Sequence, residues 1–563
     1  MAEDFMTAAV KRVEAQFAKS GVSESCAAFE RKENQIEMRD GVKLHTIYYF
    51  PKEDTAEEKT YPVILTRTCY PGNDRIHRAY GEGLARRGYV YVYQYCRGRE
   101  NSEGKWEPNI NERKDGIDTM NYLVEQPWCE ILGYWGHSYT SMTGWAFADA
   151  AEGKVAAMFL EDYGTDRFTS AYEKGCFRHD ILTAWSMENA EKPVNADYRE
   201  SCRYLPQIEV DEALWGQRVP SYREYITSPN PDAALWQTGW WKQLREIPSK
   251  TKVPIYLLSG WYDHHHGSSM KTWERLNEET KQHSWLEIGA WNHFFQICLE
   301  GKEVMHPQNE EIPKMLEWFE LTLKQKEIPT QRIRAYEIGA DRWMDTVSDG
   351  LGEKGTAGSM TLYLDEKTLR TDTPEQEKTR NYTFDPATPV ESIGGEALLH
   401  TMPQIGSHLQ PEPDYREDVL NFVSEPLEET FTLNGKASVR LFVESDCEDT
   451  VFTAKIMEVT PEGKAYNIRS SIATLEQGKT EAGTYEPGSV AEVQITMWNI
   501  VYTIPKGSRI RVDVSSSDFP QYHVHSNQKG LWSEKTENKI AHQTIHTGGV
   551  HASCVILPLM KKQ

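Results

Sequence analysis

Several features that would mark a membrane or secreted protein are missing from this sequence. No run of about 18 consecutive apolar residues occurs, so we expect no transmembrane helix and no membrane partner. The opening text, MAEDFMTAAVKRVEAQFAKSG, mixes charges with spaced apolar residues and lacks the continuous apolar segment and cleavage site of a signal peptide. We expect a surface helix there instead.

Regular cysteine spacing is also missing. The nine cysteines are scattered along the chain and include no CxxC pair, so neither a zinc knuckle nor a disulfide scaffold is expected. Isolated cysteines of this kind are typical of buried thiols in a reducing compartment. We therefore expect a cytoplasmic protein.

Positive charge is in short supply. The 62 Lys and Arg residues are outnumbered by 85 Asp and Glu, which gives a formal net charge of −23. A surface of that sign repels phosphate backbones, so no nucleic-acid partner is expected. Hydrophobic residues, in contrast, make up 39% of the 563 positions. That is enough for two or three folded domains and far from the composition of a disordered chain.

From about residue 30 to 165, short β-branched or aromatic runs alternate with polar helical segments, which is typical of βαβ units and a mostly parallel sheet. Predicted strands lie at 62–67, 89–94, 131–135 and 155–160, with a helix at 112–126. The same pattern returns with strands at 253–258 and 284–288 and a helix around 312–323. The sequence therefore predicts an α/β fold for these segments.

Two other segments have different patterns. Residues 166–246 are polar, helical in pattern and rich in tryptophan, which predicts an inserted helical cap. After about residue 345, short alternating runs separated by turn residues predict a β-sandwich, which we expect to be a jelly roll. The expected domains are an α/β catalytic domain of residues 1–165 and 247–345, a cap of residues 166–246 and a jelly roll of residues 346–563.

The most informative motif is Gly136-His137-Ser138-Tyr139-Thr140, where a predicted strand runs directly into a helix of small and aromatic residues. A serine on such a tight turn adopts a strained backbone and needs small neighbours, so that its Oγ stands clear above the sheet. Gly136 supplies one such neighbour. The backbone N–H of Tyr139, at the start of the helix, is then placed to stabilise a developing oxyanion.

An acid and a base follow in the order that α/β-hydrolases require, with each after a strand of the sheet. Asp263 follows the strand predicted at 253–258, and His293 follows the one at 284–288. His293 would accept the proton of Ser138, and Asp263 would hold the imidazole in the correct tautomer. A turn carboxylate or a loop histidine alone would be ordinary structural residues, but the three together predict a catalytic triad.

Further sequence motifs accompany the triad: Gly260-Trp261-Tyr262 before Asp263, Trp291 before His293, Cys96-Arg97-Gly98-Arg99 with Ser102-Glu103-Gly104, and Val514-Ser515-Ser516-Ser517-Asp518-Phe519-Pro520. With these motifs the chain resembles the family of bacterial cocaine esterase, X-prolyl dipeptidyl-peptidases, α-amino acid ester hydrolases and glutaryl acylases. The resemblance implies an α/β-hydrolase core, a helical cap inserted after the sixth strand and a C-terminal jelly roll. It also implies that the hydroxyl of Tyr70 joins the Tyr139 N–H in the oxyanion hole.

Two departures from the family pattern are visible. Ser141 stands where many relatives carry glycine, although serine is still small enough for close helix packing. Asp263 is followed by a run of three histidines, His264 to His266, where the resemblance implies carboxylates in enzymes that hold a substrate ammonium. An amino-ester substrate is therefore disfavoured.

Other residues near these motifs are weighed for substrate or metal contacts. We expect His264 and Trp261 to bind substrate, with a solvated loop as the alternative for the histidine. Because adjacent side chains diverge, we expect no metal site from the histidine run. Arg97 and Arg99 could bind a substrate carboxylate, but a structural salt bridge is the ordinary explanation.

We therefore expect a serine hydrolase that cleaves an ester or amide bond of a small acyl substrate through an acyl-enzyme on Ser138, without metal or organic cofactor. Its partners would be small esters, amides or short peptides, and a homodimer is left open. One alternative is an X-prolyl dipeptidyl-peptidase that releases N-terminal X-Pro dipeptides. The other is an inactive scaffold that binds carbohydrate or a protein partner through Trp498 and Trp532.

Overall fold

The fold is taken from a computed structural model, which describes residues 2–52, 59–345, 351–397 and 404–561. Ten strands form one sheet in the order β1-β2-β4-β3-β5-β6-β9-β10-β11-β12. Their bounds are β1 (Ala28–Glu37), β2 (Lys43–Lys52), β3 (Tyr61–Thr68), β4 (Val90–Tyr95), β5 (Cys129–His137), β6 (Val155–Glu161), β9 (Ile255–Gly260), β10 (Trp285–Gly289), β11 (Arg332–Glu337) and β12 (Arg342–Asp345).

The strands from β4 to β11 in the sheet order run parallel, and β1, β2 and β12 are antiparallel at the two edges. The six strands predicted for this part are confirmed as β3, β4, β5, β6, β9 and β10. The edge strands β1, β2, β11 and β12 were not predicted. β1 exposes nearly every side chain, so it lacks the apolar alternation by which a strand is recognised.

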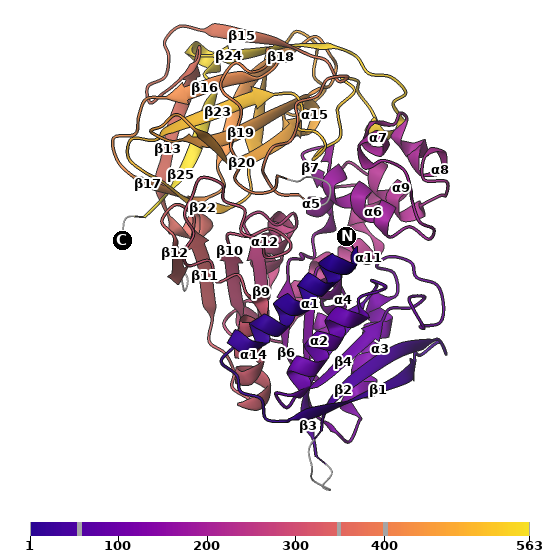
Figure 1. Ribbon diagram of the computed structural model, residues 1–563. Coiled ribbons are helices and arrows are strands. Elements are labelled where there is room, and N and C mark those ends of the chain that lie inside the picture. The colour runs from indigo at the N-terminus through magenta and orange to yellow at the C-terminus, as the bar shows by residue number, and fades with distance from the viewer. Residues whose placement is uncertain (1, 53–58, 346–350, 398–403, 562–563) are drawn as a thin grey trace.

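Helices cover both faces of this sheet (Figure 1). One face carries α1 (Ala2–Lys19), α2 (Asp74–Ala85) and α14 (Glu311–Phe319), which share an apolar cluster with the strands. The opposite face carries α3 (Glu112–Val124), α4 (Tyr139–Trp145), α11 (Gly239–Lys250) and α12 (His266–Arg275). The helices predicted at 112–126 and around 312–323 are α3 and α14. Because the central strands are parallel, their carboxyl ends lie at one edge, where the loops can converge on a site.

The segment between β6 and α11 is mostly helical, as predicted. It holds α5 (Arg167–Ala171), α6 (Ala184–Glu188), α7 (Tyr198–Arg203), α8 (Val210–Ala213), α9 (Pro220–Ile226) and α10 (Ala234–Gln237), together with the unpredicted hairpin β7 (Tyr172–Glu173) and β8 (Cys176–Phe177). Trp215 and Trp236 of this segment are buried, as is Trp241 at the start of α11. They therefore hold the cap together rather than line a pocket.

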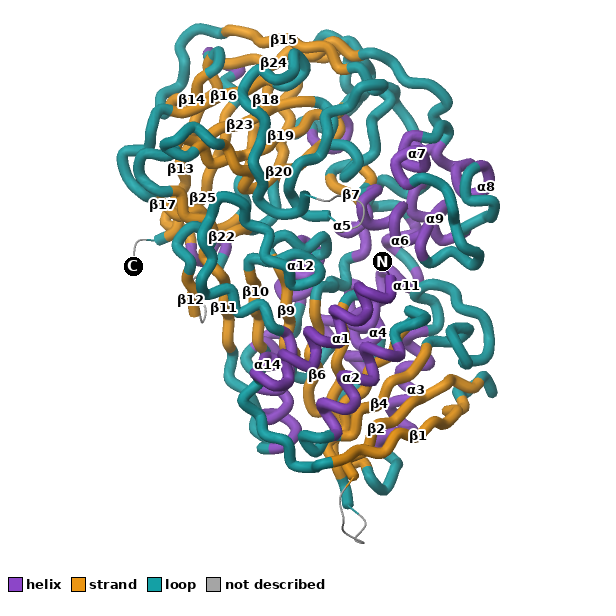
Figure 2. The backbone as a smooth tube through the Cα atoms, in the orientation of Figure 1, coloured by secondary structure: helices purple, strands orange, loops and turns teal. Residues whose placement is uncertain are grey.

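The C-terminal part is a β-sandwich made mostly of strands and loops (Figure 2). Its strands are β13 (Thr356–Asp365), β14 (Thr368–Arg370), β15 (Lys378–Phe384), β16 (Leu420–Ser424), β17 (Phe431–Gly435), β18 (Ser438–Ser445), β19 (Val451–Val459), β20 (Ala465–Thr474), β21 (Ala491–Thr496), β22 (Ile500–Ile504), β23 (Arg509–Ser515), β24 (Ala541–Thr547) and β25 (Cys554–Met560). These strands pair antiparallel except for β14 with β16. This agrees with the predicted jelly-roll architecture.

The three parts share one apolar cluster that extends from the sheet through the cap into the sandwich. A buried polar network also joins the cap to the C-terminal part, because Arg178 of the cap donates to Asp180 and to the Glu396 carbonyl, while the Glu396 side chain pairs with Arg469 of β20. The predicted domain boundary at 246 lies inside α11, and the one at 346 lies outside the described residues. Among the helices that the structure describes, none has the length and apolar character that a membrane crossing requires.

Candidate active site

Ser138 stands at the turn between β5 and α4 with φ 57° and ψ −126°, a left-handed conformation that is strained for a residue other than glycine. Hydrogen bonds hold the turn on both sides. The Ser138 N–H donates to the Glu161 carbonyl oxygen at 3.0 Å, and the Ser138 carbonyl oxygen accepts from the Ser141 N–H at 2.9 Å. A Cβ on Gly136 would lie 2.1 Å from the Thr140 carbonyl oxygen. The close approach of strand and helix therefore requires glycine there.

The structure brings the three predicted triad residues together. The Ser138 Oγ lies 3.0 Å from His293 Nε2, and His293 Nδ1 lies 2.5 Å from Asp263 Oδ2. The other carboxylate oxygen of Asp263 accepts a hydrogen bond from the His265 N–H at 2.6 Å. Asp263 and His293 are buried. This arrangement can pass a proton from an alcohol to an imidazole that a fixed carboxylate orients.

Two oxyanion donors were predicted, and both lie beside Ser138. The Tyr70 hydroxyl interacts with the Ser138 side chain. Burial raises the pKa of Tyr70 well above its usual range, so the phenol keeps its proton and can donate it. Tyr139 is the first residue of α4, and an N–H at that position has no acceptor within its own helix. Its hydroxyl is engaged elsewhere, by Glu112 at 2.8 Å.

Sequence reasoning missed Trp185, a residue of α6 in the cap. Its indole Nε1–H donates to the Tyr70 hydroxyl oxygen at 3.4 Å, and its ring stacks on Tyr139 with centroids 5.8 Å apart. Trp106 adds a third ring, 5.8 Å from Trp185. These rings form an aromatic wall beside Ser138. No motif marks Trp185, and its presence in a tryptophan-rich insertion was the sole available signal.

The two predicted substrate-binding residues have different outcomes. The His264 ring lies 4.2 Å from the His293 ring, measured between centroids, so it is placed beside the triad. The prediction for Trp261 needs correction, because its side chain is fully buried and its Nε1–H donates to the Tyr336 carbonyl oxygen at 2.8 Å. Trp261 therefore belongs to the core below the site. Sequence position next to Asp263 could not reveal which way its side chain points.

The other histidines and the two arginines are also engaged by protein groups. His265 lies 2.9 Å from the Ser170 hydroxyl, and the His266 ring packs against Trp261. Arg97 forms ion pairs with Asp115 and Asp40, and Arg99 lies 3.6 Å above the Trp106 ring. The structural explanation of Arg97 as a salt-bridge residue is confirmed.

Three groups of described residues each bring possible metal ligands within 4.8 Å of one another: His137 with Asp162 and His293, Asp263 with His264 and His293, and Glu377 with His546 and His551. The first two share His293, whose ring nitrogens already contact Asp263 and Ser138. In the third, Glu377 accepts hydrogen bonds from both histidines. Hydrogen bonds thus already engage His137 and His293 in the first two groups and His546 and His551 in the third.

Two family descriptions match the chain. Residues 40–295 match "X-Pro dipeptidyl-peptidase (S15 family)". Residues 329–556 match "X-Pro dipeptidyl-peptidase C-terminal non-catalytic domain". The first contains the three triad residues, and the second covers most of the sandwich.

The chain is similar to a cocaine esterase of Rhodococcus, with 27% identity over 574 residues that cover 94% of this chain and 98% of the relative. An α-amino acid ester hydrolase has a similar structure, with a TM-score of 0.81, 21% identity and coverage of 96% of this chain and 97% of the other. An aminopeptidase from a marine sediment thaumarchaeon gives a TM-score of 0.80 with the same identity and coverage. These structural similarities establish the fold.

Proposed function

We propose that this chain, which matches the X-Pro dipeptidyl-peptidase family descriptions and is similar to a cocaine esterase, is a serine hydrolase that cleaves esters through an acyl-enzyme intermediate on Ser138. The observation that carries the proposal is the unbroken chain of contacts from Ser138 Oγ through the two ring nitrogens of His293 to Asp263, with lengths of 3.0 and 2.5 Å.

The proposed reaction follows from these contacts. His293 Nε2 takes the hydroxyl proton of Ser138 as Oγ attacks the ester carbonyl carbon. The carbonyl oxygen becomes an oxyanion and accepts hydrogen bonds from the Tyr70 hydroxyl and the Tyr139 N–H. The imidazolium, stabilised by Asp263, then protonates the departing alkoxide. Water, activated by His293, hydrolyses the acyl-Ser138 ester and restores the free enzyme.

Side chains around the triad favour an ester over a substrate with a free ammonium group. The residue after Asp263 is His264, whose ring faces His293, and the wall of Tyr139, Trp106 and Trp185 is aromatic. An aromatic wall suits an apolar acyl or alcohol group. We propose that His264 contacts the substrate beside the triad.

Dipeptide release remains the second candidate, because one cap carboxylate is near the oxyanion donor. Glu188, the last residue of α6, exerts an electrostatic effect on the Tyr70 hydroxyl. A carboxylate at that position could hold the N-terminal ammonium of an X-Pro peptide. The scaffold alternative has less support, since Trp498 donates to Glu173 and Trp532 stacks on Phe177 and His523.

We also propose that the protein works in the cytoplasm, because all nine cysteines are free thiols and seven of them are buried. A reducing compartment keeps such thiols unmodified.

Covalent labelling with a fluorophosphonate probe tests the proposed nucleophile. The natural chain and the matched control Ser141→Ala should be labelled, whereas Ser138→Ala should lose both labelling and turnover. Labelling that survives in Ser138→Ala would refute the assignment. For substrate class, we expect a p-nitrophenyl acyl ester to be cleaved faster than a glycyl-prolyl anilide. The reverse order, abolished by Glu188→Gln, would favour dipeptide release.

A further inference from the structure

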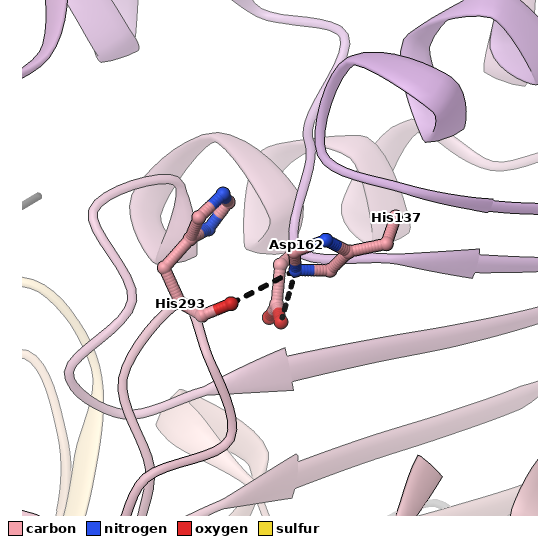
Figure 3. A group of neighbouring side chains, drawn as sticks. All are labelled: His137, Asp162 and His293. Atoms are coloured by element: carbon pink, nitrogen blue, oxygen red, sulfur yellow. Dashed lines mark hydrogen bonds and ion pairs between the residues drawn. The ribbon is translucent and has the colours of Figure 1, made fainter. Parts of the chain in front are cut away.

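A second buried carboxyl group lies beside the triad (Figure 3). Asp162 directly follows β6, its side chain is fully buried, and its φ is 48°. One carboxylate oxygen lies 3.6 Å from His137 Nε2. Asp162, His137 and His293 each place a nitrogen or oxygen within 4.8 Å of the others. A strained backbone and a buried acid this close to a catalytic histidine call for a functional explanation.

Side-chain hydrogen bonds among the described residues do not explain why the carboxyl group of Asp162 is buried. Among the described residues, neither oxygen of Asp162 has a side-chain partner with ordinary hydrogen-bond geometry, and the Gly260 N–H is a backbone group that interacts with the carboxyl group. Burial, followed by the negative charges of Asp263 and Glu311, raises the pKa of Asp162 well above its usual range. His293 and the Gly260 N–H oppose that shift. Burial and the charge of Asp263 thus both favour the neutral form of the Asp162 carboxyl group.

His137 links this acid to the loop that carries the catalytic base. Its Nε2–H donates to the carbonyl oxygen of His293 at 2.8 Å, and the two imidazole rings lie 4.8 Å apart. The same nitrogen faces Asp162. His137 therefore anchors the backbone of His293 beside the second acid, and Figure 3 shows its ring nitrogen contacting both.

We propose that Asp162 is a positioning residue of the catalytic histidine and a reserve counter-ion for its imidazolium. The inference rests on the proposed function of Ser138, Asp263 and His293. In the natural chain Asp162 lies 3.6 Å from His137 Nε2 and supports the contact by which His137 fixes the His293 loop. When the charge of Asp263 is removed, Asp162 can ionise and stabilise the positive charge that His293 acquires in the transition state.

The neighbouring residue provides a matched control. Glu161 is also fully buried, and burial together with the charge of Glu311 raises its pKa. Successive residues of a strand point to opposite faces, and Glu161 accepts a hydrogen bond from Trp135 Nε1 at 3.0 Å. Glu161 is thus a second buried acid at the end of β6, but its side chain contacts Trp135, whereas that of Asp162 faces His137.

A double-mutant cycle with a p-nitrophenyl ester tests the proposal. Asp162→Asn alone should lower kcat by less than about tenfold and leave KM unchanged, since Asp263 still supports His293. In the Asp263→Asn background, adding Asp162→Asn should lower kcat by at least about tenfold more than it does in the natural chain. Glu161→Gln should cause the same fold-change in both backgrounds.

The outcomes separate a supporting role from a structural one. Equal losses for Asp162→Asn in the two backgrounds, or no loss in either, would overturn the proposal. Thermal melting of each variant establishes that it is folded, and His137→Asn, which breaks the anchor to the His293 carbonyl, should lower kcat even where Asp263 is intact. A failure of the proposed function is recognised separately, because Ser138→Ala would then remain active.

Discussion

Tyr70 and Tyr139 lie next to each other, with ring centroids 6.2 Å apart, yet their hydroxyl groups have different surroundings. The Tyr139 hydroxyl donates to Glu112 and accepts from the Asn109 N–H, so it anchors the start of α4. The Tyr70 hydroxyl accepts from Trp185 and interacts with Ser138. Its proton is therefore available to an oxyanion. Of the two phenols, only that of Tyr70 is expected to act in catalysis.

Removing the Tyr70 hydroxyl tests this role. Tyr70→Phe should lower kcat for a p-nitrophenyl ester by about a hundredfold with little change in KM, because one oxyanion donor contributes roughly 3 kcal/mol in the transition state. Steady-state kinetics measure the effect. Tyr89→Phe is the control, since that hydroxyl contacts Glu320 away from the site. An unchanged kcat in Tyr70→Phe would contradict the role.

Trp185 gives a finer test at the same scale. Trp185→Phe keeps an aromatic ring but removes the N–H that donates to the Tyr70 hydroxyl. We expect a loss in kcat of about five- to tenfold, comparable to one neutral hydrogen bond of about 1 kcal/mol. If KM rises while kcat is unchanged, Trp185 contacts substrate and does not orient Tyr70.

At the residue scale, the sequence predicts features that depend on the order of residues along the chain. It does not predict the direction in which a side chain points in the folded protein. Ser138, Asp263 and His293 were selected because each follows a strand in the required sequence. Tyr70 needed a family resemblance, since an aromatic residue at a strand end is common. Trp261 and Asp162 show the limit, because only the folded chain reveals that one points into the core and the other toward His293.

The acid and the base of the triad are held by two neighbouring parallel strands, β9 and β10, whose loops carry Asp263 and His293. The loops touch at Gly260, where a Cβ would lie 2.1 Å from the Trp291 carbonyl oxygen. The Trp261 N–H also donates to the Gly289 carbonyl oxygen at 2.8 Å. The distance between acid and base is therefore set by backbone contacts between the loops.

Gly260→Ala should push these loops apart. We expect a stability loss of about 1–3 kcal/mol from overpacking and a larger loss of activity than that stability change explains, because the His293–Asp263 contact would lengthen. Thermal melting and ester kinetics on the same samples measure both effects. Ser259→Ala, one residue earlier on β9, is the control. Full activity in Gly260→Ala would show that the loops are not so constrained.

At the element scale, buried central strands were predictable because their apolar runs are continuous, as in Ile255–Gly260. The edge strands were not predictable, because most side chains of β1 are exposed to solvent and β12 has only four residues. The cap hairpin of β7 and β8 is two residues long in each strand. Elements of this length carry too little pattern to be recognised.

Across the whole molecule, buried neutral histidines couple folding to pH. Burial lowers the pKa of His77, in α2, to about 3, and that of His179, in the cap, to about 3. Their ordinary pKa is about 6.5. Their contribution to stability is therefore complete above about pH 6.5 and is lost as pH falls from there toward 3.

We expect each of these histidines to lower the free energy of unfolding by about 2 kcal/mol between pH 7 and pH 5. His77→Gln should flatten the decrease of the thermal midpoint over this range, although it also lowers the midpoint at pH 7. His542→Gln, at an exposed position on β24, should leave the slope as it is. A slope that is the same in all three proteins would contradict the assignment.

The fold class of each of the three parts is predictable from the spacing of its hydrophobic residues, because helices, half-exposed strands and buried strands have different spacings. Their packing was not. The contact between α12 and the sandwich depends on Gly267, where a Cβ would lie 2.3 Å from the Trp498 ring. The Arg178–Asp180–Glu396–Arg469 network joins residues more than 200 positions apart. Such pairings leave no local signal in the chain.

The central claim is that Ser138 carries the acyl group during turnover. Rapid acid quenching of the enzyme during cleavage of a p-nitrophenyl ester, followed by peptide mass spectrometry, measures this directly. We expect the mass of one acyl group on the peptide that contains Ser138 and none on any other peptide. An acyl group found on another residue, or turnover without a covalent intermediate, would contradict it.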